Sequence, residues 1–378
     1  MGYTNDNDGH CSRMEETAMQ AGLMLEVNLD KITANSARVV EKCGEKGIAV
    51  IGVTKGFSAI HQIVSAMVDG GIDELADARM ENIVELRKRH FRNPMTLLRI
   101  PRLSNVSNVV KYADISINSE VAVIQALAKT ADKMGKVHQI ILMVELGDLR
   151  EGVMQKHVLS TVEQVAGLPG LSLIGLGTNM GCFGGVLPSV QNLGRLTELG
   201  QAVEQYLGYP LKILSGGGTS SLLLVENNTM PQGINQLRVG EGILLGTDTT
   251  HNRVIPWLYQ DAFLLRAEVI EVKDKPSVPI GEIGKDAFGN IPEFEDTGIR
   301  KRAILALGRQ DAYIEGVFPL DTSLSILGAS SDHTIVDVTD SSRSIHVGDQ
   351  IAFGLTYSGL LSASDSRYVQ KVFKREGQ

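Results

Sequence analysis

The sequence has few of the features that mark a secreted, membrane-spanning or nucleic-acid-binding chain. Its 378 residues contain three cysteines, Cys11, Cys43 and Cys182, and this odd, widely spaced set argues against a disulfide framework or a zinc cluster. There is no run of about 18 apolar residues, so we expect no membrane partner. The net charge is −8. The sequence has no basic patch of the kind that nucleic-acid-binding proteins carry, so we expect no nucleic-acid partner.

The N-terminal segment also lacks an apolar core. It begins MGYTNDNDGHCSRMEETAMQ, a polar stretch without the hydrophobic region of a secretory signal. We expect residues 1–22 to form a disordered tail on a cytoplasmic enzyme. The chain as a whole is 43% hydrophobic and 21% charged, which supports a sizeable folded core.

Strand-like and helix-like segments alternate after this tail. Eight apolar strand candidates, separated by segments with helical spacing, fall within about 200 residues. They are 48–54, 74–78, 95–100, 114–118, 138–146, 171–178, 211–216 and 236–245. An earlier strand candidate, 24–30, precedes a helical segment for which Asp30 is a plausible N-cap. The pattern predicts an α/β fold with a (β/α)8 TIM barrel over residues 23–250, and a doubly wound open sheet is the alternative.

The pattern changes from about residue 255. The stretches AFLLRAEVIEVK, RAILALG, HTIVDVT and DQIAFGL are strand-like, turn signals separate them, and no helix is expected between them. We therefore expect a C-terminal β-rich domain over residues 251–378.

Lys55 stands at the end of the first barrel strand, in AVIGVTKGF. An ammonium group there is costly unless it has a partner, and the active sites of barrels lie at the carboxyl ends of the strands. Desolvation would lower the pKa of Lys55 and make it a nucleophile suited to a Schiff base with an aldehyde. The alternative interpretation is a lysine that leaves the core to reach solvent.

Two glycine-rich segments follow the last two barrel strands. In SGGGTSS, the glycines let the backbone approach a ligand, and Thr219 and Ser220 open a helix that favours a phosphate. A plain glycine-rich connection is the alternative. In LRVGEG, Arg238 is expected to point into the barrel mouth, where it needs an acceptor, and a pyridine nitrogen or a structural carboxylate would both serve. Together with Lys55, this set indicates pyridoxal 5′-phosphate, with the arginine at the ring nitrogen.

On these residues the chain resembles the fold-type III pyridoxal-phosphate enzymes, the alanine racemase group, and within it the ornithine-racemase branch. VTKG is similar to the lysine segment of that family, which implies that Lys55 is the Schiff-base lysine and one acid/base group. ELGDLREG is similar to the family's Asp-x-Gly-x-x-Arg segment. Arg150 then matches the arginine beside the cofactor, and Glu145 replaces the usual aspartate.

The resemblance also implies the remaining cofactor contacts. Asn179 falls where alanine racemases place a histidine that packs on the ring. Ser220 matches the phosphate-binding serine, and the backbone amides of Gly240 and Glu241 are implied to reach the phosphate. The expected cofactor-binding set is Lys55, Arg150, Asn179, Thr219, Ser220, Arg238, Gly240, Glu241 and Tyr357.

The β-rich part resembles the family at the loop that reaches the active site of the partner subunit. In SSDHTIVDVT, Asp332 matches the family's aspartate and Ser331 replaces a methionine. The resemblance therefore implies a head-to-tail homodimer.

One departure concerns the second acid/base group. Alanine racemases use a tyrosine of the partner subunit in a Gly-Glu-x-x-Ser-Tyr-Gly segment, but the matching stretch here, IGEIGKDAFGN, has none. Asp286 falls at that position, and a dry site would raise the pKa of its carboxyl enough for acid/base work. The other candidates are Glu282, Lys285, Tyr313 and Tyr357. Alternatively, Asp286 merely caps a loop turn.

The activity implied is that of an isomerase, an amino-acid racemase that interconverts L- and D-amino acids by two-base transfer of the α-proton. The substrate would be of ornithine or lysine type, or else alanine or serine. A distal ammonium would need an acidic wall, for which Glu241, Asp311 and Asp332 are candidates. The alternatives are a fold-type III decarboxylase, which Arg238 argues against, a single-barrel cofactor carrier, which would lack the β-rich domain, and a cofactor-free phosphate-binding barrel. No metal is expected.

Overall fold

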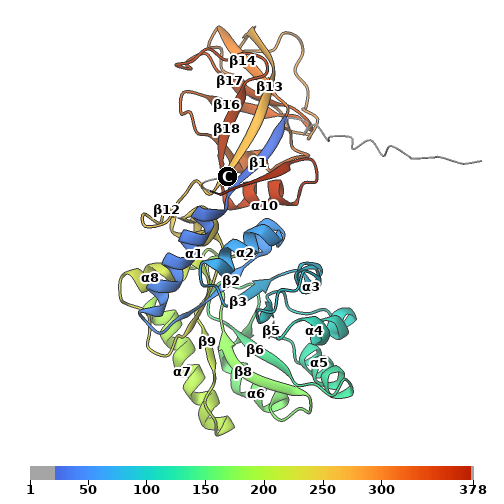
Figure 1. Cartoon of the computed structure of the whole chain (residues 1–378), viewed down its shortest axis with the longest axis vertical. Helices are drawn as coiled ribbons and strands as arrows, with labels where there is room; N and C mark the ends of the chain where they lie inside the picture. Colours follow the sequence, from blue (N-terminus) through green and yellow to red (C-terminus); the bar gives the residue numbers. More distant parts are fainter. Residues whose placement is uncertain (1–21, 376–378) are drawn as a thin grey trace, which may run out of the picture.

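The computed structural model describes residues 22–375 and contains a barrel and an antiparallel sheet at one end of it (Figure 1). The expected N-terminal tail lies outside the described residues, apart from Gly22. Within residues 22–375 no helix is both long and apolar enough to cross a bilayer.

Eight parallel strands close into the barrel. They follow the order β5-β4-β3-β2-β10-β9-β8-β6, and pairing between β5 and β6 closes the ring. The strands are β2 (Ala49–Val53), β3 (Glu74–Asp77), β4 (Met95–Leu97), β5 (Ile115–Asn118), β6 (His138–Glu145), β8 (Leu171–Gly177), β9 (Ile213–Ser215) and β10 (Gln236–Val239). The short β7 (Val153–Met154) pairs with the end of β6. The predicted TIM barrel is therefore confirmed, and the open-sheet alternative is wrong.

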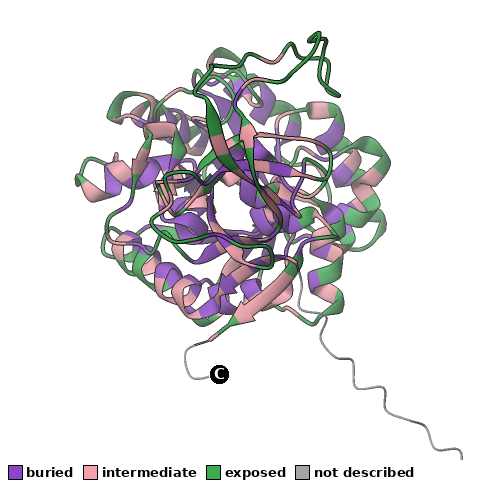
Figure 2. Ribbon diagram, turned by 90° about the horizontal axis from the view of Figure 1, so that it is seen from above, coloured by how far each residue is buried: buried purple, intermediate pink, exposed green. Residues whose placement is uncertain are grey.

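Helices surround this ring, with their buried residues turned inward (Figure 2). They are α1 (Leu29–Gly44), α2 (His61–Asp69), α3 (Met80–Lys88), α4 (Val106–Tyr112), α5 (Val121–Lys133), α6 (Val158–Val165), α7 (Val190–Leu207), α8 (Leu222–Glu226) and α9 (Glu241–Leu245). In α1 the spacing of Ile32, Val39 and Cys43 places these residues on one face, and all three are buried. The 18-residue α7 begins with a capping box between Ser189 and Asn192, which satisfies N–H groups at its start.

The C-terminal part is built on an antiparallel sheet with the order β15-β18-β13-β14-β17-β16. Its strands are β13 (Phe263–Pro276), β14 (Ile299–Leu305), β15 (Val317–Pro319), β16 (Ser325–Ala329), β17 (Thr334–Asp337), β18 (Gln350–Leu355), β19 (Gln370–Lys374) and β1 (Leu23–Asn28). A small hairpin of β11 (Thr247–Asp248) and β12 (Arg253–Val254) precedes it along the chain. The β-rich C-terminal domain is confirmed.

One helix in this part was not expected. Helix α10 (Tyr357–Asp365) follows β18, and Thr356 caps it by accepting a hydrogen bond from the Gly359 N–H. It lies where the antiparallel part meets the barrel (Figure 1). The prediction of a helix-free C-terminal region is therefore wrong, because the short stretch TYSGLLSASD carries a cap and a buried face that its polar composition conceals.

The first strand of the described chain joins the antiparallel sheet. Strand β1 pairs antiparallel with β13 and parallel with β19, although residues 23–28 were expected with the barrel. The N-cap of α1 is Asn28, whose side chain accepts a hydrogen bond from the Lys31 N–H, rather than the predicted Asp30. Helix α1 therefore starts directly where β1 ends, and this connection ties the two parts together.

Candidate active site

The turn that carries Lys55 is fixed to the neighbouring strand. Strand β2 ends at Val53, and Lys55 begins a short 3-10 turn (Lys55–Phe57). The Thr54 N–H donates to the carbonyl of Ala76 at 2.9 Å, and the Thr54 hydroxyl donates to Oδ2 of Asp77 at 2.5 Å. Lys55 therefore leaves the barrel wall from a backbone held at the carboxyl end of β3.

The surroundings of Lys55 lower its pKa. Burial of the ammonium is the largest cause, and the positive charges of Arg150 and Arg238 act in the same direction. Cys182 and Asp77 act in the opposite direction. A lysine with a lowered pKa is more often neutral and hence more nucleophilic, and the burial of the Lys55 ammonium differs from a lysine that only reaches solvent.

Asp77 is a buried carboxylate that the sequence analysis missed. Its exposed fraction is 1%, and it accepts hydrogen bonds from the Thr54 hydroxyl, the Arg79 N–H at 2.7 Å and the Asn82 amide at 3.1 Å. Burial raises the pKa of Asp77, although these hydrogen bonds oppose the shift. The available signal was its position near the end of ELADA, because the active sites of barrels are built from residues at the carboxyl ends of the strands.

Arg238 lies buried on β10, near the carboxyl ends of the neighbouring barrel strands. Its Nη2 donates to the carbonyl of Thr178 at 2.7 Å and to Oδ1 of Asn179 at 2.8 Å, and its Nη1 donates to the Ser215 hydroxyl. The acceptor that a buried arginine needs is thus supplied by neutral groups on the neighbouring strand ends. Burial lowers the pKa of Arg238 to about 10, so its guanidinium remains charged at neutral pH.

The glycine-rich segment after β9 forms a tight cradle. Gly217 has φ +100°, a conformation that favours glycine, and Ser221 donates its hydroxyl to the Gly216 carbonyl at 2.6 Å. Ser220 is buried within the 3-10 turn Thr219–Ser221. The Thr219 hydroxyl accepts a hydrogen bond from the Gly242 N–H at 3.1 Å. This bond holds the cradle against the start of α9.

The last barrel strand is shorter than predicted. It ends at Val239, and residues 241–245 form α9 instead of extending the strand. A Cβ at Gly240 would lie 3.2 Å from Cβ of Val53, so the chain turns where it passes closest to β2. The Glu241 carboxylate accepts hydrogen bonds from Thr247 and Thr249, at the β11 hairpin. It is therefore already bonded within the chain and does not form the acidic wall that was considered for a distal ammonium.

Two carboxylates organise the segment that carries Arg150. Glu145 accepts hydrogen bonds from the backbone N–H groups of Gly147 and Arg150. Asp148, which the sequence analysis did not single out, has an exposed fraction of 1%. It accepts hydrogen bonds from the N–H groups of Cys182, Phe183, Gly184 and Val186 at 3.0 to 3.3 Å. The loop after β6 is thereby joined to the loop after β8.

A third carboxylate, Glu151, meets Arg150 directly. The Arg150 Nε and Nη2 donate to the two carboxylate oxygens of Glu151, the latter at 2.6 Å. The Asn179 amide donates to the same carboxylate, while its Oδ1 accepts from Arg238. Burial is the largest single cause and lowers the pKa of Arg150, but the hydrogen bonds to Glu151 together with the nearby charges of Cys182, Glu151 and Asp148 raise that pKa overall. Glu151 follows Arg150 directly in the chain, and no residue spacing indicated a role for it.

Tyr357 reaches the site from the antiparallel part of the same chain. It is the first residue of α10, and a Cβ at Gly56 would lie 3.0 Å from its ring and 3.5 Å from its hydroxyl. The Ser58 hydroxyl donates to Asp365 of the same helix at 3.2 Å. Burial raises the pKa of Tyr357 to about 12, so its hydroxyl keeps its proton.

Three predicted residues are not brought to this site by the chain's own fold. Asp286 is exposed and accepts hydrogen bonds from the N–H groups of Phe288 and Asn290, at 2.9 and 2.8 Å. Asp332 accepts from the Ser331 hydroxyl at 3.0 Å. The described side-chain hydrogen bonds of Asp286, Ser331 and Asp332 are local, and those of Asp286 are the ones expected of a turn cap. A role of these residues across a subunit boundary stays a prediction.

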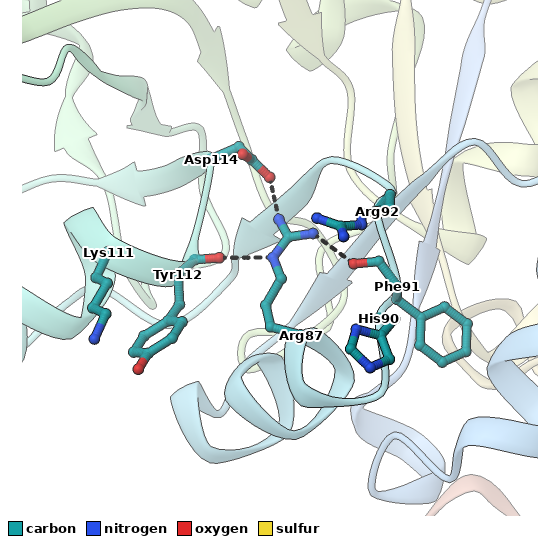
Figure 3. A pocket seen from close by; sticks show the side chains of 7 residues that line it. All are labelled: Arg87, His90, Phe91, Arg92, Lys111, Tyr112 and Asp114. Carbon is teal, nitrogen blue, oxygen red and sulfur yellow. Dashed lines mark hydrogen bonds and ion pairs between the residues drawn. The ribbon is translucent and has the colours of Figure 1, made fainter.

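A separate hollow lies on the outside of the barrel, between α3 and α4 (Figure 3). Its lining is Arg87, His90, Phe91, Arg92, Lys111, Tyr112 and Asp114. Arg87 donates to the carbonyls of Tyr112 and Phe91 and pairs with Asp114, so it fastens the connections around the two helices. Asp114 precedes β5, which places the hollow at the amino ends of the strands, away from Lys55. Residues 22–375 hold no cluster of three or more metal-ligating side chains.

Comparison with known proteins gives one consistent set of relatives. The family described as alanine racemase, N-terminal domain, matches residues 27–248. Ornithine racemase of Acetoanaerobium sticklandii is 43% identical over 91% of this chain and 98% of that protein. Lysine racemase of Thermotoga maritima is 42% identical over 92% of this chain and 97% of that protein.

Solved structures share the fold at low sequence identity. Alanine racemase of Clostridium difficile 630 has a TM-score of 0.75 at 18% identity, over 95% of this chain and 97% of that one. Alanine racemase from Bartonella henselae, solved with covalently bound pyridoxal phosphate, has a TM-score of 0.72 at 15% identity, over 94% of this chain and 100% of that one.

Proposed function

The chain belongs to the alanine racemase family, and from that premise we propose that it is a pyridoxal-phosphate-dependent racemase of a basic amino acid of the ornithine or lysine type. Racemase activity, and hence an isomerase, follows from the near full-length similarity to two curated racemases. The cofactor, the substrate class and the roles of individual residues are supported by the site.

The observation that carries the proposal is the meeting of Lys55, Arg150 and Arg238 at one end of the barrel. A lysine with a lowered pKa suits attachment to an aldehyde. The cradle around Ser220 offers a hydroxyl and backbone N–H groups for a phosphate, and Arg238 suits a ring nitrogen. The residues therefore fit pyridoxal 5′-phosphate. When bound, this cofactor supplies an electron sink for the α-carbon of an amino acid.

The chain's own groups then set the course of the reaction. Arg238 retains its protons at neutral pH, so it would donate to the ring nitrogen without protonating it. This restraint limits how far charge spreads into the ring and disfavours transamination. Lys55, with its lowered pKa, can accept the α-proton on one face of the substrate. Tyr357, which keeps its proton, helps to hold the phosphate.

Racemisation needs a second acid/base group on the opposite face. We retain Asp286 for this role, supplied by a second copy of the chain, with Glu282, Lys285 and Tyr313 as the other candidates on the antiparallel part. In the single chain, hydrogen bonds from Asn290 and Phe288 lower the pKa of Asp286. Burial against a barrel mouth would raise that pKa into the range useful for proton transfer.

A head-to-tail homodimer is supported by an apolar surface on the segment that carries Asp286. Its large side chains are exposed, with Ile280 at 93% and Ile291 at 71%. The exposed apolar residues of this segment are Ile280, Ile283, Phe288, Ile291, Phe294 and Ile299. Large apolar side chains exposed at this density along one segment are typical of an interaction site, and a second copy would cover them. The cytoplasmic location expected from the sequence stays a prediction.

The experiment is racemisation in deuterium oxide with the purified, cofactor-loaded protein and L-ornithine, L-lysine, L-alanine and L-serine. Loss of the α-proton signal with formation of the D-isomer from ornithine or lysine is the expected result. Inversion of alanine or serine alone would contradict the substrate class. Carbon dioxide release without inversion would favour the decarboxylase, and no visible cofactor band and no exchange would favour the cofactor-free barrel.

A further inference from the structure

The loop after β6 places a carboxylate between the two arginines of the site. Glu151 accepts hydrogen bonds from Nε and Nη2 of Arg150 and, on the same carboxylate, from the Asn179 amide. Oδ1 of Asn179 in turn accepts from Nη2 of Arg238 at 2.8 Å. A continuous hydrogen-bonded path therefore runs from Arg150 through Glu151 and Asn179 to Arg238.

We propose that Glu151 is a positioning residue, which holds Arg150 and, through Asn179, Arg238 in fixed orientations at the carboxyl end of the barrel, where they would contact the cofactor. This inference rests on the proposed function, and it assigns to Glu151 a role that neither motif spacing nor the family resemblance indicated. Its carboxylate matches the fork of a guanidinium, which fixes direction as well as charge.

The other carboxylates near the site accept hydrogen bonds from groups other than the two arginines. Asp77 holds the Lys55 turn, while Glu145 and Asp148 accept hydrogen bonds from backbone N–H groups. Among the described residues, Glu151 is the carboxylate that pairs with a guanidinium of this site. Its side chain is 17% exposed and that of Arg150 is 34% exposed, so water weakens this pair less than a fully exposed one.

The backbone on both sides of Glu151 is held in place. The Arg150 N–H donates to Glu145 at 3.1 Å. Gly152 has φ +145°, and a Cβ there would lie 2.6 Å from the backbone nitrogen of Glu145. The loop packs this closely against the end of β6, so the backbone of Glu151 is held in place. The hydrogen bonds of its carboxylate then orient the Arg150 side chain.

The test compares Glu151→Gln and Glu151→Asp with a control, Glu198→Gln. Glu198 pairs with Arg195 at 2.6 Å on the exposed face of α7, so the control removes the same charge from a similar pair outside the site. For each loaded enzyme, kcat and KM are measured separately, and for each apoprotein the affinity for pyridoxal phosphate is measured.

We expect Glu151→Gln to lower kcat/KM by about tenfold or more, the usual effect of losing a charged hydrogen-bond partner, and to weaken cofactor affinity. Glu151→Asp should recover part of both, because the charge remains, and Glu198→Gln should match the wild type. Wild-type kinetics and cofactor affinity in Glu151→Gln would overturn the proposal, as would a Glu151→Asp enzyme no better than Glu151→Gln.

A double-mutant cycle tests the hydrogen bond between Glu151 and Asn179 without relying on activity. The unfolding free energies of apo Glu151→Ala, Asn179→Ala and the double variant should be non-additive, because each single variant removes the hydrogen bond that the two side chains share. Additive changes in the unfolding free energy would show that Glu151 and Asn179 are not coupled, and would overturn the proposed connection between the two arginines. If the wild type racemises none of the amino acids, the proposed function fails, while the cycle and the cofactor affinities still decide whether Glu151 positions the arginines.

Discussion

The Thr54 hydroxyl donates to Oδ2 of Asp77 at 2.5 Å, and this bond fixes the residue that immediately precedes Lys55. Two neighbouring strands, β2 and β3, are thereby joined at the point where the reactive side chain leaves the barrel wall. The direction in which Lys55 enters the mouth depends on the Thr54 hydroxyl and on the buried carboxylate of Asp77, which lies outside the VTKG segment.

Loss of the Thr54 hydroxyl should lower both the free energy of unfolding and kcat. Thr54→Val keeps the side-chain volume but leaves Asp77 without one donor, which should cost about 1 to 3 kcal/mol in the free energy of unfolding. Because the start of the Lys55 turn is loosened, kcat should fall as well. Urea unfolding and steady-state kinetics measure the two effects, and Thr54→Ser, which keeps the donor, should stay near wild type. Equal behaviour of both variants would contradict this account.

Replacement of Lys55 should stabilise the apoprotein while it abolishes racemisation. Burial lowers the pKa of Lys55 below its ordinary value of 10.5, so the unfolded chain binds the proton more tightly than the folded one. The resulting destabilisation is complete below the lowered pKa and disappears as the pH rises to 10.5. Lys55→Met should therefore melt at a higher temperature than wild type at neutral pH, and the difference should shrink with rising pH. A difference in melting temperature that grows with pH would contradict a lowered pKa of Lys55 in the folded protein.

Asp286→Asn tests the second acid/base group. We expect racemisation to fall by about a hundredfold or more, because a positioned acid/base group ordinarily contributes that much. Exchange of the α-proton on the Lys55 face should continue, and cofactor binding should be kept. Deuterium exchange and chiral analysis are followed together. Asp296→Asn, on the same segment, is the control, and full activity of Asp286→Asn would transfer the role to Glu282, Lys285 or Tyr313.

The proposed dimer predicts that the apolar segment around Asp286 is needed for assembly. Ile280→Glu should dissociate the protein in sedimentation analysis and reduce activity at low protein concentration, because a charge would have to be buried in the interface. Val137→Glu is a matched control, since Val137 is 67% exposed and lies just before β6, at the amino ends of the strands. A wild-type protein that sediments as a monomer while fully active would contradict the dimer.

Much of the barrel was predictable because its signals are local. Each predicted strand contains the observed one, since buried parallel strands are short, apolar and separated by helical spacing. The positions of Lys55 and of the glycine-rich cradle could be predicted because both follow directly after barrel strands. Helix α10 and the pairing of β1 could not, because the helix is short and polar in composition and a strand of alternating residues fits either sheet equally well.

The sequence by itself determined the order of strands and helices, the glycines that allow tight turns and the position of Lys55 after β2. Only the tertiary structure decided which charges meet. Residues far apart in sequence, such as Arg150 and Arg238, are joined through Glu151 and Asn179 because closing the barrel brings separate strand ends to one mouth. Side-chain hydrogen bonds of this kind depend on angles and distances of a few ångströms, which residue spacing along a chain does not encode.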